Sequence, residues 1–188
     1  MLAIVHCCDI ITTPLLKKLD LSRIVKMLRS YLFDILPRFK GLKYLILGSG
    51  SGGVSNVYHQ KFLTAVQAMA YLQYFSLTYD CTDEIIHALA QNNAKTLKVL
   101  DVEYSTLVTD NSLNDIILLK QLLQIHIFHT GISLAGKARL ILNLKQLKVL
   151  VRGDFLCDAL DFIAEEMDLD IFGMQCKILP IYTYLFQM

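Results

Sequence analysis

Apolar residues recur along the chain in a spaced triplet, Leu-x-x-Leu-x-Leu or a close variant. Complete triplets begin at Leu16, Leu42, Leu72, Leu97 and Leu122, and an incomplete one begins at Leu147 with Arg152 in its third place. These starts are 26, 30, 25, 25 and 25 residues apart. A fixed period in this range is typical of stacked repeats, whose units bury their apolar faces only against one another. We therefore expect about six repeats over residues 16–171.

The unit that begins at Leu97 carries the signals of one strand and one helix. Residues 98–102 alternate in polarity and include β-branched residues, which predicts a short strand. Thr109 and Asp110 then form a helix-start signal. The apolar residues that follow at helical spacing are Leu113, Ile116, Ile117 and Leu119. Stacked units of this kind predict an α/β fold in which a parallel sheet lies against a layer of helices.

This pattern resembles the cysteine-containing leucine-rich repeat of F-box proteins, Leu-x-x-Leu-x-Leu-x-x-Cys-x-x-Ile-Thr-Asp-x-x-Leu-x-x-Leu. The matching residues of one unit are Leu97, Leu100, Val102, Ser105 in the cysteine place, Val108, Thr109, Asp110, Leu113 and Ile116. In the unit at Leu72, Cys81 and Thr82 are displaced by one or two places, and the unit at Leu122 lacks the Thr-Asp step. The resemblance implies a ribonuclease-inhibitor-like solenoid, with a curved sheet on the concave face and helices on the convex face.

The two ends of the chain depart from the repeat. Residues 1–15 are expected to form an N-terminal capping helix or the remnant of a preceding repeat, and residues 172–188 an apolar C-terminal segment. An F-box would need more residues ahead of Leu16 than these. Either the chain is a fragment that lacks its F-box or it belongs to a repeat-only relative.

Composition narrows the range of functions. With 18 basic and 17 acidic residues, the net charge of +1 does not favour binding to nucleic acid, which requires many phosphates to be neutralised. The longest uncharged span, residues 62–79, is expected to divide into a helix and a strand, so no membrane segment is predicted. The five cysteines include no C-x-x-C pair, which indicates reduced thiols and a cytoplasmic or nuclear location.

Candidate binding residues gather on the predicted concave face of the middle units. Alternation along a strand places them there if the other strand positions point into the core. They are Tyr74, Tyr79, Asp101, Glu103, Tyr104, His126, Phe128 and His129. Large aromatic residues flanked by charge are typical of protein-binding hot spots, so the patch is predicted to bind a protein segment with basic character. In the alternative interpretation, these aromatics only cover the sheet and contact one another as cross-strand neighbours.

The resemblance implies a substrate receptor of an F-box-type ubiquitin ligase, in which another subunit performs the chemistry and this chain needs no cofactor. A repeat-only scaffold or inhibitor is one alternative. A nucleotide-binding enzyme is another, because residues 48–53 read G-x-G-x-x-G after a predicted strand. The acidic residue expected about 20 residues further on is absent, and Asp80 is the nearest strand-end candidate. An insertion in a repeat turn is therefore favoured over a phosphate site.

Metal and hydrolase sites are not predicted. Residues three apart on a strand point to opposite faces, and no third ligand accompanies His126 and His129 in the sequence. Asp101 and Glu103 share a face, but paired carboxylates without a nucleophile or a partner acid do not make a hydrolase.

Overall fold

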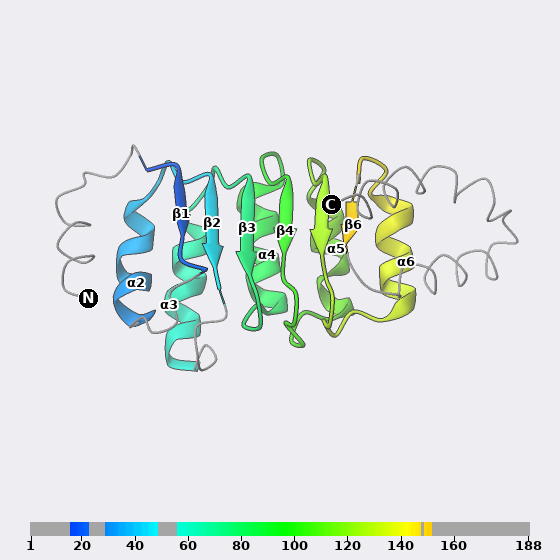
Figure 1. The fold of residues 1–188 in the computed structure, drawn as a ribbon, viewed down its shortest axis with the longest axis horizontal. Helices are drawn as coiled ribbons and strands as arrows, with labels where there is room; N and C mark the ends of the chain where they lie inside the picture. Colours follow the sequence, from blue (N-terminus) through cyan, green and yellow to red (C-terminus); the bar gives the residue numbers. More distant parts are fainter. Residues whose placement is uncertain (1–15, 23–28, 49–55, 148, 152–188) are drawn as a thin grey trace, which may run out of the picture.

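The computed structural model describes residues 16–22, 29–48, 56–147 and 149–151, in which strands alternate with helices (Figure 1). The strands are β1 (Lys18–Asp20), β2 (Tyr44–Leu47), β3 (Tyr74–Leu77), β4 (Val99–Asp101), β5 (Gln124–His126) and β6 (Val149–Val151). The helices are α2 (Arg29–Ile35), α3 (Asn56–Gln67), α4 (Asp83–Asn93), α5 (Leu113–Leu118) and α6 (Leu134–Asn143), with short 3-10 turns η2 (Leu36–Arg38) and η3 (Asp110–Ser112).

The six strands form one parallel sheet in chain order. Each strand pairs with the next in a register that aligns the same place of successive triplets. Leu45 lies opposite Leu19 and Phe75, and Leu100 lies opposite Phe75 and Ile125. Residues that are 25 apart in the sequence are therefore neighbours in space over β3, β4 and β5.

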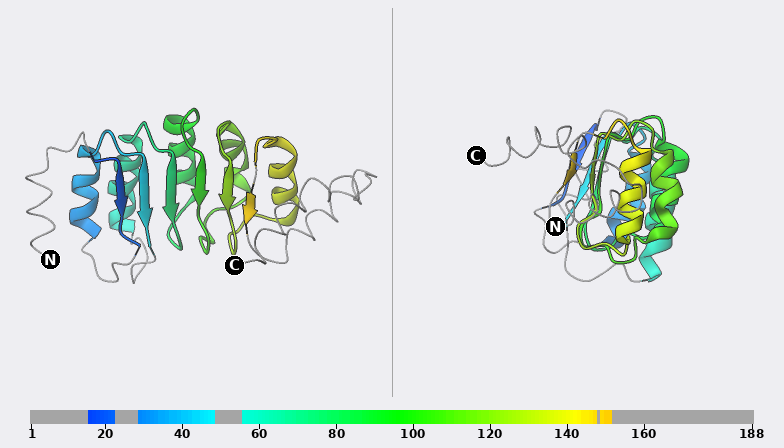
Figure 2. Two further views of the ribbon diagram at one scale, coloured as in Figure 1. Left: turned by 45° about the horizontal axis from the view of Figure 1, so that its top comes forward. Right: turned by 90° about the vertical axis from the view of Figure 1, so that its right-hand side faces the viewer.

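The described helices lie in a single layer on one face of the sheet (Figure 2). Strand residues that point toward this layer are fully buried, including Leu45, Phe75, Leu100 and Ile125. Buried helix residues such as Ile86 belong to the same apolar cluster as these strand residues. We call the opposite side of the sheet, which no described helix covers, the helix-free face. Functional side chains on β3–β5 must therefore be sought on this face.

The predicted helix-start signals are confirmed. The side chain of Thr82 caps α4 by accepting a hydrogen bond from the N–H of Ile85, and Thr109 caps η3 by accepting one from Asn111. The neighbouring Asp83 does not cap its own helix. Its carboxylate accepts hydrogen bonds from the N–H and the hydroxyl of Thr109, at 2.8 and 2.6 Å, and so ties one unit to the next.

Two buried polar side chains also join successive units. Asn93, with no exposed surface, accepts a hydrogen bond from the N–H of Leu72 and donates one to the carbonyl oxygen of Met69, both at 2.9 Å. Ser105, equally buried, accepts from the N–H of Cys81 at 3.2 Å and donates to the carbonyl oxygen of Leu77 at 3.3 Å. Each side chain satisfies backbone groups that have no partner in a helix or sheet ladder.

The prediction of an α/β fold with a parallel sheet and alternating helices is confirmed. Its finer interpretation as a leucine-rich-repeat solenoid stays a prediction. Residues 62–79 divide between α3 and β3 as expected. Among the described residues, no helix is long and apolar enough to cross a membrane. The predictions for residues 1–15, 152–171 and 172–188 lie outside the described residues.

Candidate functional site

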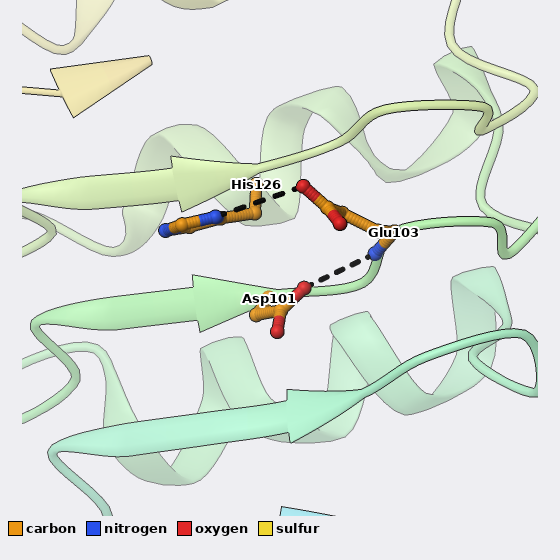
Figure 3. Close-up of side chains that lie close together, drawn as sticks. All are labelled: Asp101, Glu103 and His126. Carbon is orange, nitrogen blue, oxygen red and sulfur yellow. Dashed lines mark hydrogen bonds and ion pairs between the residues drawn. The ribbon is translucent and has the colours of Figure 1, made fainter. Parts of the chain in front are cut away.

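Asp101, Glu103 and His126 come together on the helix-free face (Figure 3). Asp101 and His126 are the last residues of β4 and β5, where they are paired in register, and Glu103 follows β4 by two residues. The carboxylate oxygens and an imidazole nitrogen of this acidic cluster all lie within 4.8 Å of one another. All three residues are half-buried. The predicted carboxylate pair is thus extended by a histidine from the next strand.

Hydrogen bonds hold the Asp101 carboxylate in one orientation. The hydroxyl of Ser76 donates to Oδ2 at 2.8 Å, and the N–H of Glu103 donates to Oδ1 at 3.3 Å. Nδ1 of His126 lies 3.7 Å from Oε1 of Glu103. No lysine or arginine among the described residues forms an ion pair with either carboxylate. The acidic cluster therefore carries negative charge that the described part of the chain does not neutralise.

Tyr74 lies beside this cluster, on β3. Its partial burial, followed by the negative charges of Asp101 and Asp20, raises the pKa of its hydroxyl above the usual value near 10. Its ring pairs with that of Tyr44 on β2, with centroids 6.3 Å apart. Tyr44 was missed as a site residue, although it occupies the same repeat place as Tyr74 and is paired with it in register.

The other aromatic candidates form a ladder just beyond the ends of β3, β4 and β5. The rings of Tyr79 and Tyr104 stack with centroids 4.9 Å apart and planes 9° apart, and His129 stacks on Tyr104 at 5.4 Å. Phe128 meets Tyr104 edge-on at 5.6 Å. We call these four residues the aromatic ladder. Tyr79 and Tyr104 are 54% and 38% exposed, so the ladder presents ring surface to solvent.

The backbone of the ladder is held in an unfavourable conformation at three equivalent places. Tyr79, Tyr104 and His129 have φ values of 75°, 62° and 52°, in the left-handed region that aromatic residues rarely occupy. Such residues cost about 1–3 kcal/mol each and persist where the surroundings over-determine them. Here the N–H of Tyr79 donates to the carbonyl oxygen of Glu103, and that of Tyr104 donates to Phe128, at 3.0 and 2.7 Å. Each of these two bonds joins the left-handed residue of one unit to the next unit.

The arrangement of the acidic cluster does not match a closed metal site. A closed site has four protein ligands, whereas this cluster offers three ligand atoms, all within 4.8 Å of one another. His129 does not join His126, because its ring stacks in the ladder. Asp101, Glu103 and His126 were predicted on the same face as parts of a binding patch, and not as a set of metal ligands.

The glycine-rich sequence is described only at its first residue, and residues 49–55 lie outside the described residues. Gly48 follows β2 and packs against the backbone of Ser22, which follows β1. A Cβ added at Gly48 would lie 2.8 Å from the Cα of Ser22. This glycine is therefore required by the close approach of two neighbouring strand ends. Its role needs no bound phosphate.

Histidine and acidic side chains also meet on the helical layer, but there they pair between neighbouring helices. His59 of α3 lies 2.7 Å from Glu84 of α4, and His87 of α4 lies 3.1 Å from Asp115 of α5. Of these paired side chains, Glu84, His87 and Asp115 line a depression between the three helices. The helix-free face is therefore the better candidate for a binding site.

No family model and no curated protein sequence matches this chain.

Proposed function

We propose that this chain is a leucine-rich-repeat module that binds a protein segment on its helix-free face. The repeat interpretation is supported by the period of 25 residues together with a strand register that follows the same period. A stack of this kind acts by presenting an extended surface, since each unit contributes the same few positions to it.

One observation carries the proposal: exposed stacked aromatic rings lie next to carboxylates that no described lysine or arginine neutralises. Exposed aromatic clusters are uncommon on the surface of a monomer, and Tyr is enriched among residues that dominate binding energy. The negative charge of Asp101 and Glu103 favours a partner with basic character.

The resemblance to F-box proteins extends the proposal to a substrate receptor of a ubiquitin ligase in the cytoplasm or nucleus. In that role, the helix-free face selects the target and other subunits perform the chemistry. A free-standing scaffold or inhibitor that uses the same face is the alternative. The step from repeat to ligase rests on analogy between folds, so it needs its own readout.

The test is affinity capture from a cytosolic lysate with three versions of the chain. Tyr104→Ala combined with Phe128→Ala removes two rings of the ladder and should abolish capture of the partner. Tyr71→Ala is the matched control, because Tyr71 is 59% exposed but precedes β3, at the opposite end of that strand. A photo-crosslinking amino acid at position 79 should join the captured protein to this face.

The ligase role predicts that adaptor and cullin subunits are captured equally by all three versions when each is made in a full-length protein that includes the F-box. A partner that depends on the ladder without any ligase subunit would favour the scaffold or inhibitor. Equal capture of every protein by the double variant, with unchanged circular dichroism, would contradict recognition through this face.

A further inference from the structure

The acidic cluster and the aromatic ladder together suggest a specific chemical group in the partner. Two carboxylates on one face within 4.8 Å repel each other, and the described residues supply only the imidazole of His126 beside them. The Coulomb repulsion between them favours a cation that lies between or above them. The site is therefore prepared for a positively charged group that arrives from outside.

The fixed orientation of Asp101 favours a donor group with defined geometry. Because Ser76 and the Glu103 backbone hold its carboxylate, Asp101 offers its remaining lone pairs in fixed directions. A guanidinium has five N–H donors in a planar fork, so it can bridge two carboxylates and donate to both. An ammonium is a strongly hydrated point charge without this fork, and it gains less from two oriented acceptors.

The ladder supplies the second feature of guanidinium recognition. Tyr79 ends the ladder: its ring stacks on Tyr104, its side chain is 54% exposed, and its N–H donates to the carbonyl oxygen of Glu103 at 3.0 Å. Guanidinium groups lie against aromatic rings through cation–π attraction and planar stacking. The hydrogen bonds that hold Tyr79 and Tyr104 in the left-handed region keep these rings in place before a partner arrives.

We propose that the bound segment presents an arginine whose guanidinium pairs with Asp101 and Glu103 and lies against the exposed ring of Tyr79 at the end of the aromatic ladder. This inference rests on the proposed function, since it names the side chain by which the partner is recognised. A divalent cation is the competing occupant of the acidic cluster, and an acidic or phosphorylated segment is disfavoured by the charge of the two carboxylates.

The test uses three capped pentapeptides of the same sequence, Gly-Ser-X-Ser-Gly, in which X is arginine, lysine or citrulline. Each is titrated into the ¹⁵N-labelled full chain with EDTA present, and backbone amide shifts are followed by NMR. The arginine peptide should bind weakly, with a Kd of about 1 mM, and should shift the amides of Glu103, Tyr104 and His126. The lysine peptide should bind about tenfold more weakly, and the citrulline peptide, which has similar shape but no charge, should give no saturable shift.

Variants assign the two parts of the site. Asp101→Asn combined with Glu103→Gln should abolish binding of the arginine peptide. The matched control, Glu84→Gln, removes an exposed acid on the helical layer and should leave binding unchanged. Tyr79→Leu keeps the carboxylates and should reduce the preference for arginine over lysine to about threefold or less.

Equal binding of the arginine and citrulline peptides, or shifts confined to the helical layer, would overturn the inference. So would the absence of any saturable shift at millimolar peptide. If that absence accompanies ladder-dependent capture of a protein, the proposed function stands and only the arginine is wrong. If capture also fails to depend on the ladder, both proposals fail.

A titration with Zn²⁺ in place of EDTA tests a divalent cation as the competing occupant. If Zn²⁺ shifts the amides of Glu103, Tyr104 and His126 and the arginine peptide does not, the acidic cluster is a metal site and the inference is wrong.

Discussion

Asn93→Ala should lower the free energy of unfolding by about 2–6 kcal/mol. The substitution removes the partner of the Leu72 N–H and the partner of the Met69 carbonyl oxygen, which are 2.9 Å from the Asn93 amide. Leu72 and Asn93 have no exposed surface and Met69 has only 1%, so water does not replace the lost bonds without rearrangement. Leaving one buried polar group unpaired costs about 1–3 kcal/mol, and two such groups are affected here. Domains of this size are stable by only about 5–15 kcal/mol.

The adjacent residue offers a matched control. Asn92 is also on α4, but it is exposed, and its side chain donates only to the carbonyl oxygen of Ala88 one turn earlier. Asn92→Ala should therefore change stability by less than about 0.5 kcal/mol. The assay is urea unfolding followed by circular dichroism, in which the midpoint should fall for Asn93→Ala while the m-value stays the same.

A third substitution tests the role of the donated hydrogen bond. Asn93→Asp keeps the shape of the side chain, but an ionised carboxylate cannot donate to Met69. Burial would raise the pKa of the introduced carboxyl above its unfolded value of about 3.9. The protonated form can donate, so the variant should be most stable at low pH and should lose stability as the pH rises through the folded-state pKa. A cost of less than about 1 kcal/mol for Asn93→Ala, or a cost equal to that of Asn92→Ala, would refute the reasoning.

Three further predictions concern buried or partly buried polar groups. Ser105→Ala should cost about 1–3 kcal/mol in urea unfolding, because the N–H of Cys81 and the carbonyl oxygen of Leu77 lose their partner; a neutral effect would show that these groups find another. Burial raises the pKa of the Cys81 thiol, so peptide mapping should find it unmodified by iodoacetamide at pH 8 until urea unfolds the chain. The pKa of Tyr74, measured by NMR titration of labelled tyrosine, should exceed 10 and should fall in Asp101→Asn. Because the folded-state pKa of Tyr74 is raised, its contribution to stability is present below about pH 10 and is lost as the pH rises through the folded-state pKa. An unchanged Tyr74 pKa in Asp101→Asn would show that the carboxylate does not act on it.

Local patterns were sufficient to predict the elements of the middle units. The Thr-Asp steps at Thr82 and Thr109 mark helix starts because a side-chain oxygen there satisfies a free backbone N–H, and this requirement is local. The spacing of Leu97, Leu100 and Val102 predicted a strand whose alternate residues are buried, as observed. The ring contacts of the ladder are those that the alternative interpretation expected, in which the aromatics contact one another as cross-strand neighbours.

Local patterns did not predict every contact of the site. Ser76 shares a face with the predicted residues, but only the structure shows that it is 4% exposed and donates to Asp101. Asp101, Glu103 and His126 were predicted to share a face, but only the structure shows that their ligand atoms lie within 4.8 Å of one another.

The period of the apolar triplets was enough to establish the class of fold, because strands of equal spacing with intervening helices bury their apolar faces only when they stack in order. The left-handed backbone at Tyr79, Tyr104 and His129 has no counterpart in any local pattern. Hydrogen bonds to the neighbouring unit hold Tyr79 and Tyr104 in that conformation. The direction of each ring and carboxylate on the helix-free face depends on contacts between residues about 25 positions apart, and such contacts exist only once the units have packed together.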